Sequence, residues 1–252
     1  MTEIRIIGQG GFGIVENIGG NIARKKLLLD ENEEVNTHLR RRFKREVEYQ
    51  KMCNHPNVVT VLDSDLESSE PWFTMPLAVC FLGQERNHNI PIDDNQKIII
   101  SKMLMNGLTH IHSIGQIHRD IKPQNILRFH SADNSTFIYA ISDFGLVANR
   151  DVENTTTLTS VTTIMGTQAY MSPECYLDAR NASFQSDIYS LGVVLKFIFD
   201  GEVGIPYSER TSSSLLNDII RKCTKRNPNE RYDSVTELIL DFEQTISESE
   251  YN

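Results

Sequence analysis

Eight consecutive residues, His118–Asn125, hold a carboxylate, an ammonium group and a carboxamide at close spacing. Asp120 is followed two positions later by Lys122 and five positions later by Asn125. Pro123 lies between them, and proline lacks the N–H that a helix interior requires. The pattern therefore predicts a rigid loop that presents a proton acceptor, a phosphate clamp and a metal ligand at one point.

A second carboxylate opens the motif Asp143-Phe144-Gly145, 18 residues after Asn125. The two motifs, H-R-D-x-x-x-x-N and D-F-G, resemble those of the eukaryotic-type (Hanks-type) serine/threonine protein kinases. The resemblance extends from Gly8 to about Phe242. It implies the α+β, two-lobed protein-kinase fold, with a small antiparallel β-sheet lobe carrying one major helix and a larger, mainly helical lobe.

The resemblance leaves no room for a second domain, so we expect one catalytic domain over residues 1–252. Its small lobe is predicted over about 1–75, the hinge over about 76–79 and the large lobe over about 80–252.

The composition, with 39% hydrophobic and 23% charged residues, is that of an ordinary soluble globular protein. The net charge of -9 argues against a protein held mainly by nucleic-acid phosphates. The four cysteines form no C-x-x-C pair, which fits a reducing compartment. The longest apolar run, Leu191–Phe199, is interrupted by Lys196 and is shorter than the ~20 residues that span a bilayer. We therefore predict a cytoplasmic protein without nucleic-acid or membrane partners.

A glycine-rich segment, Gly8–Gly13, lies between two predicted strands, Ile4–Ile7 and Ile14–Ile18. A dinucleotide-binding loop would need a helix directly after the glycines. A flap between strands instead lets backbone amides close over phosphates. The alternative is a glycine-rich hairpin that binds nothing. The resemblance implies ATP contacts from the flap and the surrounding walls: Gly8, Gln9, Gly10, Gly11, Phe12, Gly13, Val15, Ala23, Lys25, Met75, Pro76, Ala78 and Leu127.

Lys25, in Ile22-Ala23-Arg24-Lys25, matches the family's phosphate-binding lysine. Lys26 is its rival, but strand alternation places Lys26 on the opposite face. A charged helical pattern follows over about Glu33 to Cys53, and its spacing makes Glu46 the partner of Lys25. The alternative is that Glu46 is one more exposed acid.

One position departs from the family pattern. Gln50 stands one turn after Glu46, where the family normally has an apolar residue that docks the helix. The departure predicts either looser docking or a helix that needs a signal to settle.

The basic cluster Arg40–Arg42, Lys44 and Arg45 has three interpretations. It could be a nucleic-acid patch or a solvated helix face, of which the second is favoured. The resemblance adds a third, in which Arg42 and Arg45 face a phosphorylated activation loop together with Arg119.

Further strands are predicted over Val58–Leu62 and Trp72–Met75. Met75-Pro76-Leu77-Ala78 then falls where the family's hinge holds adenine, with a carbonyl from Pro76 and an amide from Ala78. A helix capped by Asp93 or Asp94 is predicted to run to about Ser113.

A threonine-rich segment follows Asp143 and ends in Gly166-Thr167-Gln168-Ala169-Tyr170-Met171-Ser172-Pro173-Glu174, which resembles an activation loop. The resemblance implies autophosphorylation between Thr155 and Thr163, with Thr162 or Thr163 favoured, and a substrate-shaping role for Thr167. It also implies a structural pair between Glu174 and Arg231, and a structural Asp187 on a buried helix.

The resemblance implies ATP- and Mg²⁺-dependent phosphorylation of serine and threonine hydroxyls on protein substrates, with Mn²⁺ as a possible replacement. Asn125 and Asp143 would hold the metal, Lys25 and Glu46 would orient the phosphates, Asp120 would align the attacking hydroxyl, and Lys122 would neutralise the γ-phosphate. Autophosphorylation would require transient self-association.

Two rival functions are a pseudokinase, a binding scaffold without phosphotransfer, and a small-molecule phosphotransferase of related fold. The presence of Lys25, Asp120, Asn125 and Asp143 argues against the pseudokinase, which Gln50 mainly supports. The long threonine-rich loop argues against the second rival.

Overall fold

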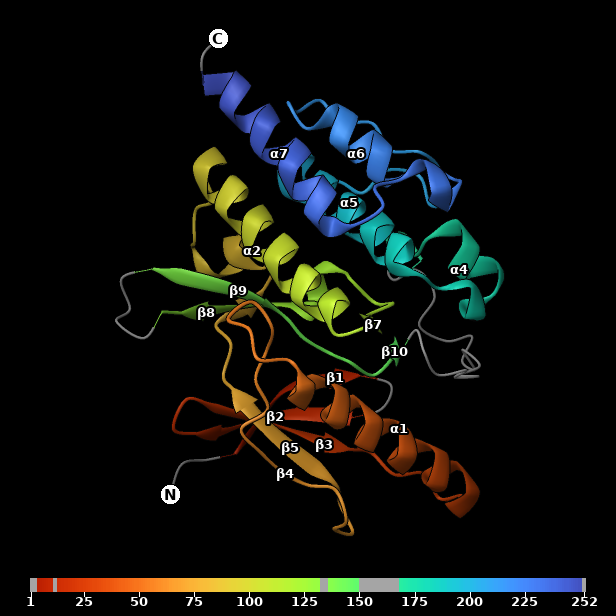
Figure 1. The fold of residues 1–252 in the computed structure, drawn as a ribbon. Coiled ribbons are helices and arrows are strands. Elements are labelled where there is room, and N and C mark those ends of the chain that lie inside the picture. Colours follow the sequence, from red (N-terminus) through yellow and green to blue (C-terminus); the bar gives the residue numbers. More distant parts are fainter. Residues whose placement is uncertain (1–3, 11–12, 132–135, 150–167, 251–252) are drawn as a thin grey trace.

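A five-stranded antiparallel sheet with one long helix forms the N-terminal part of the chain (Figure 1). The computed structural model describes residues 4–10, 13–131, 136–149 and 168–250, so the predicted site residues Gly11, Phe12, Thr162, Thr163 and Thr167 lie outside the described residues. The strand order is β1-β2-β3-β5-β4. The elements are β1 Arg5–Gly10, β2 Gly13–Gly19, β3 Ile22–Leu27, α1 Glu33–Met52, β4 Asp63–Asp65 and β5 Trp72–Pro76.

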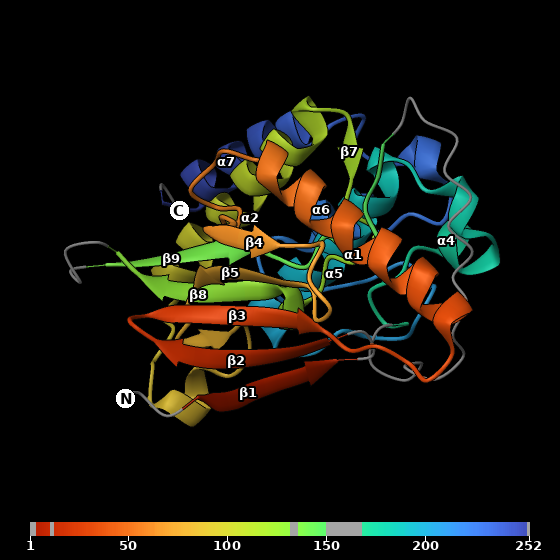
Figure 2. The same ribbon diagram turned by 90° about the horizontal axis from the view of Figure 1, so that it is seen from below.

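A side-chain cap at Asn32 starts the long helix α1. The Asn32 side chain accepts a hydrogen bond from the Glu34 amide at 2.9 Å, which satisfies one of the free N–H groups at the helix start. Phe43 and Val47 are buried on one face of α1, in the same apolar cluster as Phe73 of the sheet. Figure 2 shows β1, β2 and β3 side by side, with α1 running beside them.

The strand predicted over Val58–Leu62 is wrong, because the sheet strand β4 begins only at Asp63. The last residue of the segment, Leu62, donates its amide to the Thr74 carbonyl of β5 at 2.8 Å, but Val58 and Val59 bond outside the sheet. Val58 forms an isolated parallel bridge with Ile141, and the Val59 amide donates to the Ile141 carbonyl at 2.9 Å. The Val59 carbonyl accepts from the Gln50 side chain, so Val58 and Val59 join α1 to the C-terminal part rather than extending the sheet.

Helices dominate the C-terminal part of the chain (Figure 1). They are α2 Asp94–Ser113, α4 Pro173–Leu177, α5 Phe184–Asp200, α6 Asn217–Cys223 and α7 Val235–Glu250, with single 3₁₀ turns η1 Glu85–His88, η2 Pro123–Asn125, η3 Ala179–Asn181 and η4 Pro228–Glu230. Short strands join them: β6 Cys80–Phe81, β7 Gln116–Ile117, β8 Ile126–His130, β9 Phe137–Ile141 and β10 Ala148–Asn149.

Two of these helices explain how the C-terminal part is built. The predicted start of α2 is correct, because Asp93 and Gln96 cap each other's backbone amides in a capping box. In α5 the eleven residues from Ser186 to Lys196 are all buried, so this helix forms the centre of the C-terminal core. Among the helices that the structure describes, none has the length and apolar character needed to cross a membrane.

The α+β, two-lobed architecture predicted from the sequence is therefore confirmed. The hairpin of β8 and β9 lies between the sheet and the helices (Figure 1). Asp120 lies in the loop before β8, and Asp143 follows the end of β9. Both predicted carboxylates therefore lie where the sheet and the helices meet.

Candidate active site

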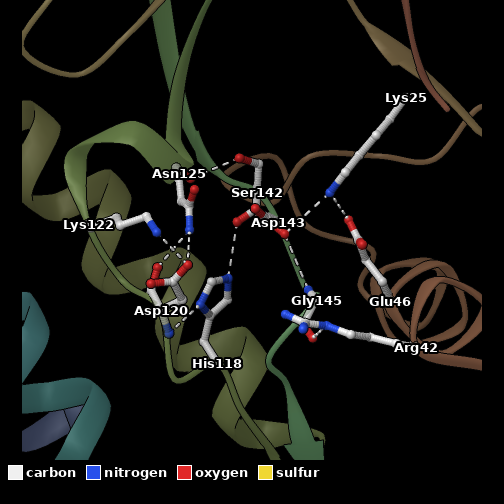
Figure 3. Close-up of polar contacts among 10 residues, drawn as sticks. All are labelled: Lys25, Arg42, Glu46, His118, Asp120, Lys122, Asn125, Ser142, Asp143 and Gly145. Atoms are coloured by element: carbon white, nitrogen blue, oxygen red, sulfur yellow. Dashed lines mark hydrogen bonds and ion pairs between the residues drawn. The ribbon is translucent and has the colours of Figure 1, made fainter. Parts of the chain in front are cut away.

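Asp120 is bonded directly to both Lys122 and Asn125, and the three residues are called the loop group below (Figure 3). Lys122 Nζ lies 2.7 Å from Asp120 Oδ2. Asn125 Nδ2 donates to the same oxygen at 2.9 Å and to the Asp120 backbone carbonyl, also at 2.9 Å. The turn η2, which begins at Pro123, brings the three side chains together over only six residues.

A buried carboxylate from the core helix α5 anchors this loop. Asp187 is fully buried and accepts hydrogen bonds from the His118 amide at 2.7 Å and the Arg119 amide at 2.8 Å. Arg119 has a φ of 70°, which costs a side-chain-bearing residue about 1–3 kcal/mol. The two bonds to Asp187 offset that strain and fix the loop to the core.

His118 connects the loop to the segment before Asp143. Its Nδ1 accepts from the Asp120 amide at 3.3 Å, so its Nε2 carries the proton that reaches the Ser142 carbonyl at 3.1 Å. Its ring meets the Phe144 ring edge-on, with centroids 5.1 Å apart. Burial lowers the pKa of His118, in agreement with a neutral ring that donates once and accepts once.

Lys25, Glu46 and Asp143, called the clamp group below, come from three separate elements. Lys25 Nζ lies 2.5 Å from Glu46 Oε1 of α1 and 3.4 Å from Asp143 Oδ1. Lys26, the rival lysine, points to the other side of β3 and contacts Glu70 at 2.8 Å. In Figure 3 the Asp143 carboxylate lies between the loop group and the Lys25–Glu46 pair.

The charges of the site shift several pKa values. Desolvation raises the pKa of Asp143, but the positive charges of Lys25 and Lys122 and the Gly145 amide outweigh it and bring the value to about 2. Burial lowers the pKa of Lys25, but the carboxylates of Asp143 and Glu46 outweigh it and raise the pKa. Burial also raises the pKa of Asp120, against the opposing charge of Lys122. Asp143 is therefore ionised and Lys25 protonated at neutral pH.

Arg42 contacts the site in a way that the sequence analysis missed. Its Nε donates to the Gly145 carbonyl at 3.0 Å, so α1 is bonded directly to the segment that carries Asp143 (Figure 3). Arg42 precedes Glu46 by four residues, which places both on one face of the helix. None of the three interpretations of the basic cluster included this contact, although the four-residue spacing from Glu46 is visible in the sequence.

The predicted walls of the nucleotide site gather around β1, β2 and β3. Gly8, Gln9, Gly10 and Gly13 lie on the β1–β2 hairpin, and a Cβ at Gly13 would come within 2.6 Å of the Lys26 carbonyl, so only glycine fits there. The apolar candidates share one packed cluster: Val15, Ala23, Met75 and Leu127.

The predicted hinge follows directly after Met75 in β5. The Leu77 amide donates to the Asn21 carbonyl at 2.8 Å, and the Val79 amide donates to the Arg128 carbonyl at 2.8 Å. These bonds hold the chain on both sides of Ala78. Pro76 and Ala78 also line a cavity of about 590 Å³ between the hinge and the β8–β9 hairpin, and neither Asp120 nor Asp143 lines this space.

Glu174 and Arg231 form a bidentate ion pair. Nη1 of Arg231 lies 2.7 Å from Oε1 of Glu174, and Nη2 lies 2.8 Å from Oε2. Ser186 of α5 also donates to Glu174 at 2.8 Å. The pair ties the segment after Met171 to the helical core.

Gln50 does not show the loose docking that its polarity suggested. It is 1% exposed, and its Nε2 donates to the Val59 carbonyl at 2.7 Å. Its Oε1 is buried without a hydrogen-bond partner. A directed hydrogen bond therefore docks α1 at this position, where the resemblance implied an apolar side chain.

Two oxygen donors suited to Mg²⁺ lie close together. The Asn125 carbonyl accepts from both the Ser142 amide at 2.8 Å and the Ser142 hydroxyl at 3.0 Å, which brings the residue before Asp143 against Asn125. Because Asn125 Nδ2 is bonded to Asp120, its Oδ1 is the atom left for a cation. A carboxylate and an amide oxygen fit Mg²⁺, which takes few protein ligands and is completed by phosphates and water.

Comparison with known proteins agrees with this geometry. The curated relatives include three bacterial enzymes named as serine/threonine-protein kinases. PrkC of Bacillus subtilis (strain 168) is 28% identical over 280 residues, covering 99% of this chain and 41% of its own length. PknB of Mycobacterium leprae (strain TN) is 31% identical, covering 94% and 41%. A probable PknB of Lactococcus lactis subsp. lactis (strain IL1403) is 28% identical, covering 97% and 42%.

The chain thus spans about two fifths of the length of these relatives. Residues 1–248 match the sequence family described as the protein kinase domain. With the loop and clamp groups assembled where the sheet meets the helices, this match over nearly the whole chain shows that the chain belongs to the protein kinase family.

Proposed function

We propose that this chain transfers the γ-phosphate of ATP to serine and threonine hydroxyls of protein substrates, with Mg²⁺ or, in its place, Mn²⁺. The observation that carries the proposal is the meeting of the loop group and the clamp group around Asp143 (Figure 3). The loop group contains Asp120, which would align the acceptor hydroxyl, and the clamp group contains Lys25, which would orient the phosphates of ATP. Phosphoryl transfer requires both functions.

In the loop group, Asp120 accepts the hydrogen bond of the attacking hydroxyl and aligns its oxygen with the phosphorus. Asn125 and Lys122 both bond to Oδ2 of Asp120 and so fix the orientation of its carboxylate. Lys122 also provides positive charge where negative charge develops on the transferred group.

In the clamp group, Lys25 orients the α- and β-phosphates while Glu46 fixes its position. Asp143 and Asn125 would hold the metal ion, which supplies positive charge that offsets the phosphate charge. The Arg42 bond to Gly145 keeps the chain beside Asp143 in place.

The acceptor class and the domain extent are also proposals. A lysine two residues after the catalytic aspartate resembles serine/threonine kinases, and the relatives with that name support the same class. We further propose that residues 1–252 act as one catalytic domain with its hinge at about 76–79. A cytoplasmic location and the lack of nucleic-acid and membrane partners stay predictions from composition.

A phosphate switch is supported by three neighbouring cations. Burial lowers the pKa of both Arg42 and Arg119. The positive charge of Arg45 lowers each pKa further, although the carboxylates of Asp143 and Glu46 act in the opposite direction on Arg42. A phosphate on Thr162 or Thr163 would offset this mutual repulsion. Phosphopeptide mapping after incubation with ATP tests the switch, and finding no phosphate between Thr155 and Thr167 would contradict it.

Autophosphorylation between molecules requires transient self-association. The initial rate of phosphate incorporation should then rise with the square of the protein concentration. A rate that rises only in proportion to concentration would mean that each molecule phosphorylates itself.

The catalytic proposal is tested by transfer of labelled γ-phosphate to the chain itself and to a generic basic protein. Wild type should transfer, and Asp120→Ala should show essentially no transfer, because the hydroxyl loses its acceptor. Asp218→Asn is the matched control, since the Asp218 side chain is 93% exposed on α6. Equal signals from wild type and Asp120→Ala would favour the pseudokinase.

A further inference from the structure

Arg210 is the largest fully buried side chain in the described part of the chain. Among the described residues, no carboxylate lies within ion-pair distance of its guanidinium group. Its Nη2 donates to the Ala169 carbonyl at 2.9 Å and its Nη1 to the Ser208 hydroxyl at 3.1 Å, while Nε has no partner. Burial lowers its pKa. A buried charge without a counter-charge is costly, so this arginine calls for an explanation.

The buried Arg231 provides the contrast. Arg231 is 4% exposed and makes two bonds to the Glu174 carboxylate. Both arginines lie near Tyr189 of α5, whose ring is 4.9 Å from the Arg231 guanidinium carbon and whose hydroxyl donates to the Ser208 carbonyl at 3.3 Å. Arg231 thus has the charged partner expected for an arginine that stabilises the core. Arg210 instead donates to two uncharged groups, the Ser208 hydroxyl and the Ala169 carbonyl.

That carbonyl belongs to a turn beside the catalytic loop. Ala169 lies within the turn Gln168–Met171, closed by a bond from the Met171 amide to the Gln168 carbonyl at 3.3 Å. Tyr170 and Met171 line a small cavity together with Asp120. The turn therefore forms part of the surface next to the carboxylate that is proposed to align the acceptor hydroxyl.

Arg210 is held firmly enough to position this turn. Its amide donates to the Thr224 hydroxyl at 2.8 Å. Gly204 has a φ of 72°, and a Cβ there would lie 3.3 Å from Arg210 Cδ, so the glycine leaves room for the arginine stem. The Ser208 hydroxyl that receives Nη1 is itself bonded to the Ile205 carbonyl at 2.8 Å.

We infer that Arg210 is a positioning residue for the protein substrate: it fixes the turn Gln168–Met171 through the Ala169 carbonyl, and the turn supports the substrate backbone next to the acceptor residue. Arg210 touches neither substrate nor nucleotide. The inference rests on the proposed function and adds to it that recognition of the acceptor segment depends on an interaction 41 residues away in the sequence. Binding of ATP, at the clamp group, should not depend on it.

The experiment compares full-length Arg210→Met and Arg210→Lys with wild type, using one serine-containing basic peptide. Arg210→Met should raise the KM for the peptide about tenfold, the size expected when a hydrogen bond from a charged donor is lost. The KM for ATP and the slow transfer of phosphate to water should stay within about twofold. Arg210→Lys, which keeps one charged donor, should recover part of the peptide KM. Arg180→Met is the control, because the Arg180 side chain is 71% exposed.

Amide hydrogen exchange gives a second measurement that needs no activity. Peptides covering residues 168–172 should exchange faster in Arg210→Met than in wild type, while peptides covering α2 should not change. An unchanged peptide KM in a folded variant would overturn the inference, and so would a parallel loss of ATP and peptide binding with a lower melting temperature. If Arg210→Met does not fold, the comparison uses Arg210→Lys. If wild type transfers no phosphate, the proposed function fails, and unchanged exchange at 168–172 would overturn the inference separately.

Discussion

The loop group and the clamp group differ in how far apart in the sequence their members lie. Asn125 and Asp120 are five residues apart and bond directly. In the clamp group, Lys25 and Glu46 are 21 residues apart, and Lys25 and Asp143 are 118 residues apart. A short segment can hold the first group, whereas the second exists only when β3, α1 and the segment after β9 are all in place.

The two groups also differ in what supports them. The loop group is fixed by Asp187, which is fully buried in the core helix α5. In the clamp group, the Asp143 side chain is 42% exposed, and Arg42 and Gln50 of α1 each make one hydrogen bond to the segments that join it to the C-terminal part. The comparison indicates that disturbing the loop group damages folding, whereas the clamp group can be disturbed in a folded protein.

The largest effect is expected from Asp187→Ala. The amides of His118 and Arg119 would lose their buried acceptor, and each hydrogen bond to a charged group contributes about 1.5–3 kcal/mol. The free energy of unfolding should fall by about 3–5 kcal/mol, and phosphotransfer should fall with it. Urea denaturation measures the change, with the exposed Asp218→Ala as control. A variant of unchanged stability would show that the loop is not anchored by α5.

Glu46→Gln should disturb the clamp group and lower phosphotransfer while leaving the protein folded. Lys25 would lose the charge that fixes its position, so kcat/KM should fall on the order of 100-fold. The urea midpoint should change far less than in Asp187→Ala. Glu48→Gln is the matched control, because Glu48 lies two positions along α1 and is exposed. Adding Lys25→Met to Glu46→Gln should cost less than the two single losses combined, because the two residues act as a pair.

The pH dependence of stability tests the neutral state of His118. Because burial lowers its pKa in the folded protein, the unfolded chain takes up this proton first as the pH falls below about 6.5. The free energy of unfolding should therefore decrease on acidification, with His118 contributing at most about 1.4 kcal/mol per pH unit. Urea titrations between pH 7.5 and 5.5 measure the slope.

His118→Phe should flatten this slope, because phenylalanine cannot take up a proton yet keeps an aromatic ring against Phe144. His88→Gln, at an exposed position, is the control substitution. Equal slopes for wild type and His118→Phe would show that His118 does not carry the pH dependence.

The parts of the molecule that were predictable from sequence are those controlled by local chemistry. The β1–β2–β3 hairpins follow from alternation and glycine turns, and the start of α2 follows from the Asp93 capping box. The loop group belongs to the same class, because its spacing alone brings Asp120, Lys122 and Asn125 together.

The parts that were not predictable depend on tertiary partners. The apolar run Val58–Leu62 reads as a strand, yet its backbone bonds to Ile141 and to the Gln50 side chain, which no local pattern reveals. The contact of Arg42 with Gly145 spans 103 residues. The burial of Arg210 is likewise not visible in the sequence, because no local pattern around it indicates a buried residue.

The smallest effect is expected from Gln50→Met, which tests whether α1 needs the hydrogen bond from Gln50 to the Val59 carbonyl to stay in place. The Val59 carbonyl would lose its donor, while the buried and unpaired Gln50 Oε1 would be removed. These two effects oppose each other, so the free energy of unfolding should change by less than about 1 kcal/mol. Phosphotransfer should stay within about threefold of wild type, since α1 would keep its apolar packing.

Gln50→Glu gives the matching contrast, because it removes the donor and places a carboxylate against the Val59 carbonyl. A buried charge without a partner should cost more than about 2 kcal/mol of stability. If Gln50→Met instead lost as much activity as Glu46→Gln, the hydrogen bond to Val59 would be part of what assembles the clamp group. Packing alone would then be insufficient to hold α1, and the clamp group would depend on Gln50 as the loop group depends on Asp187.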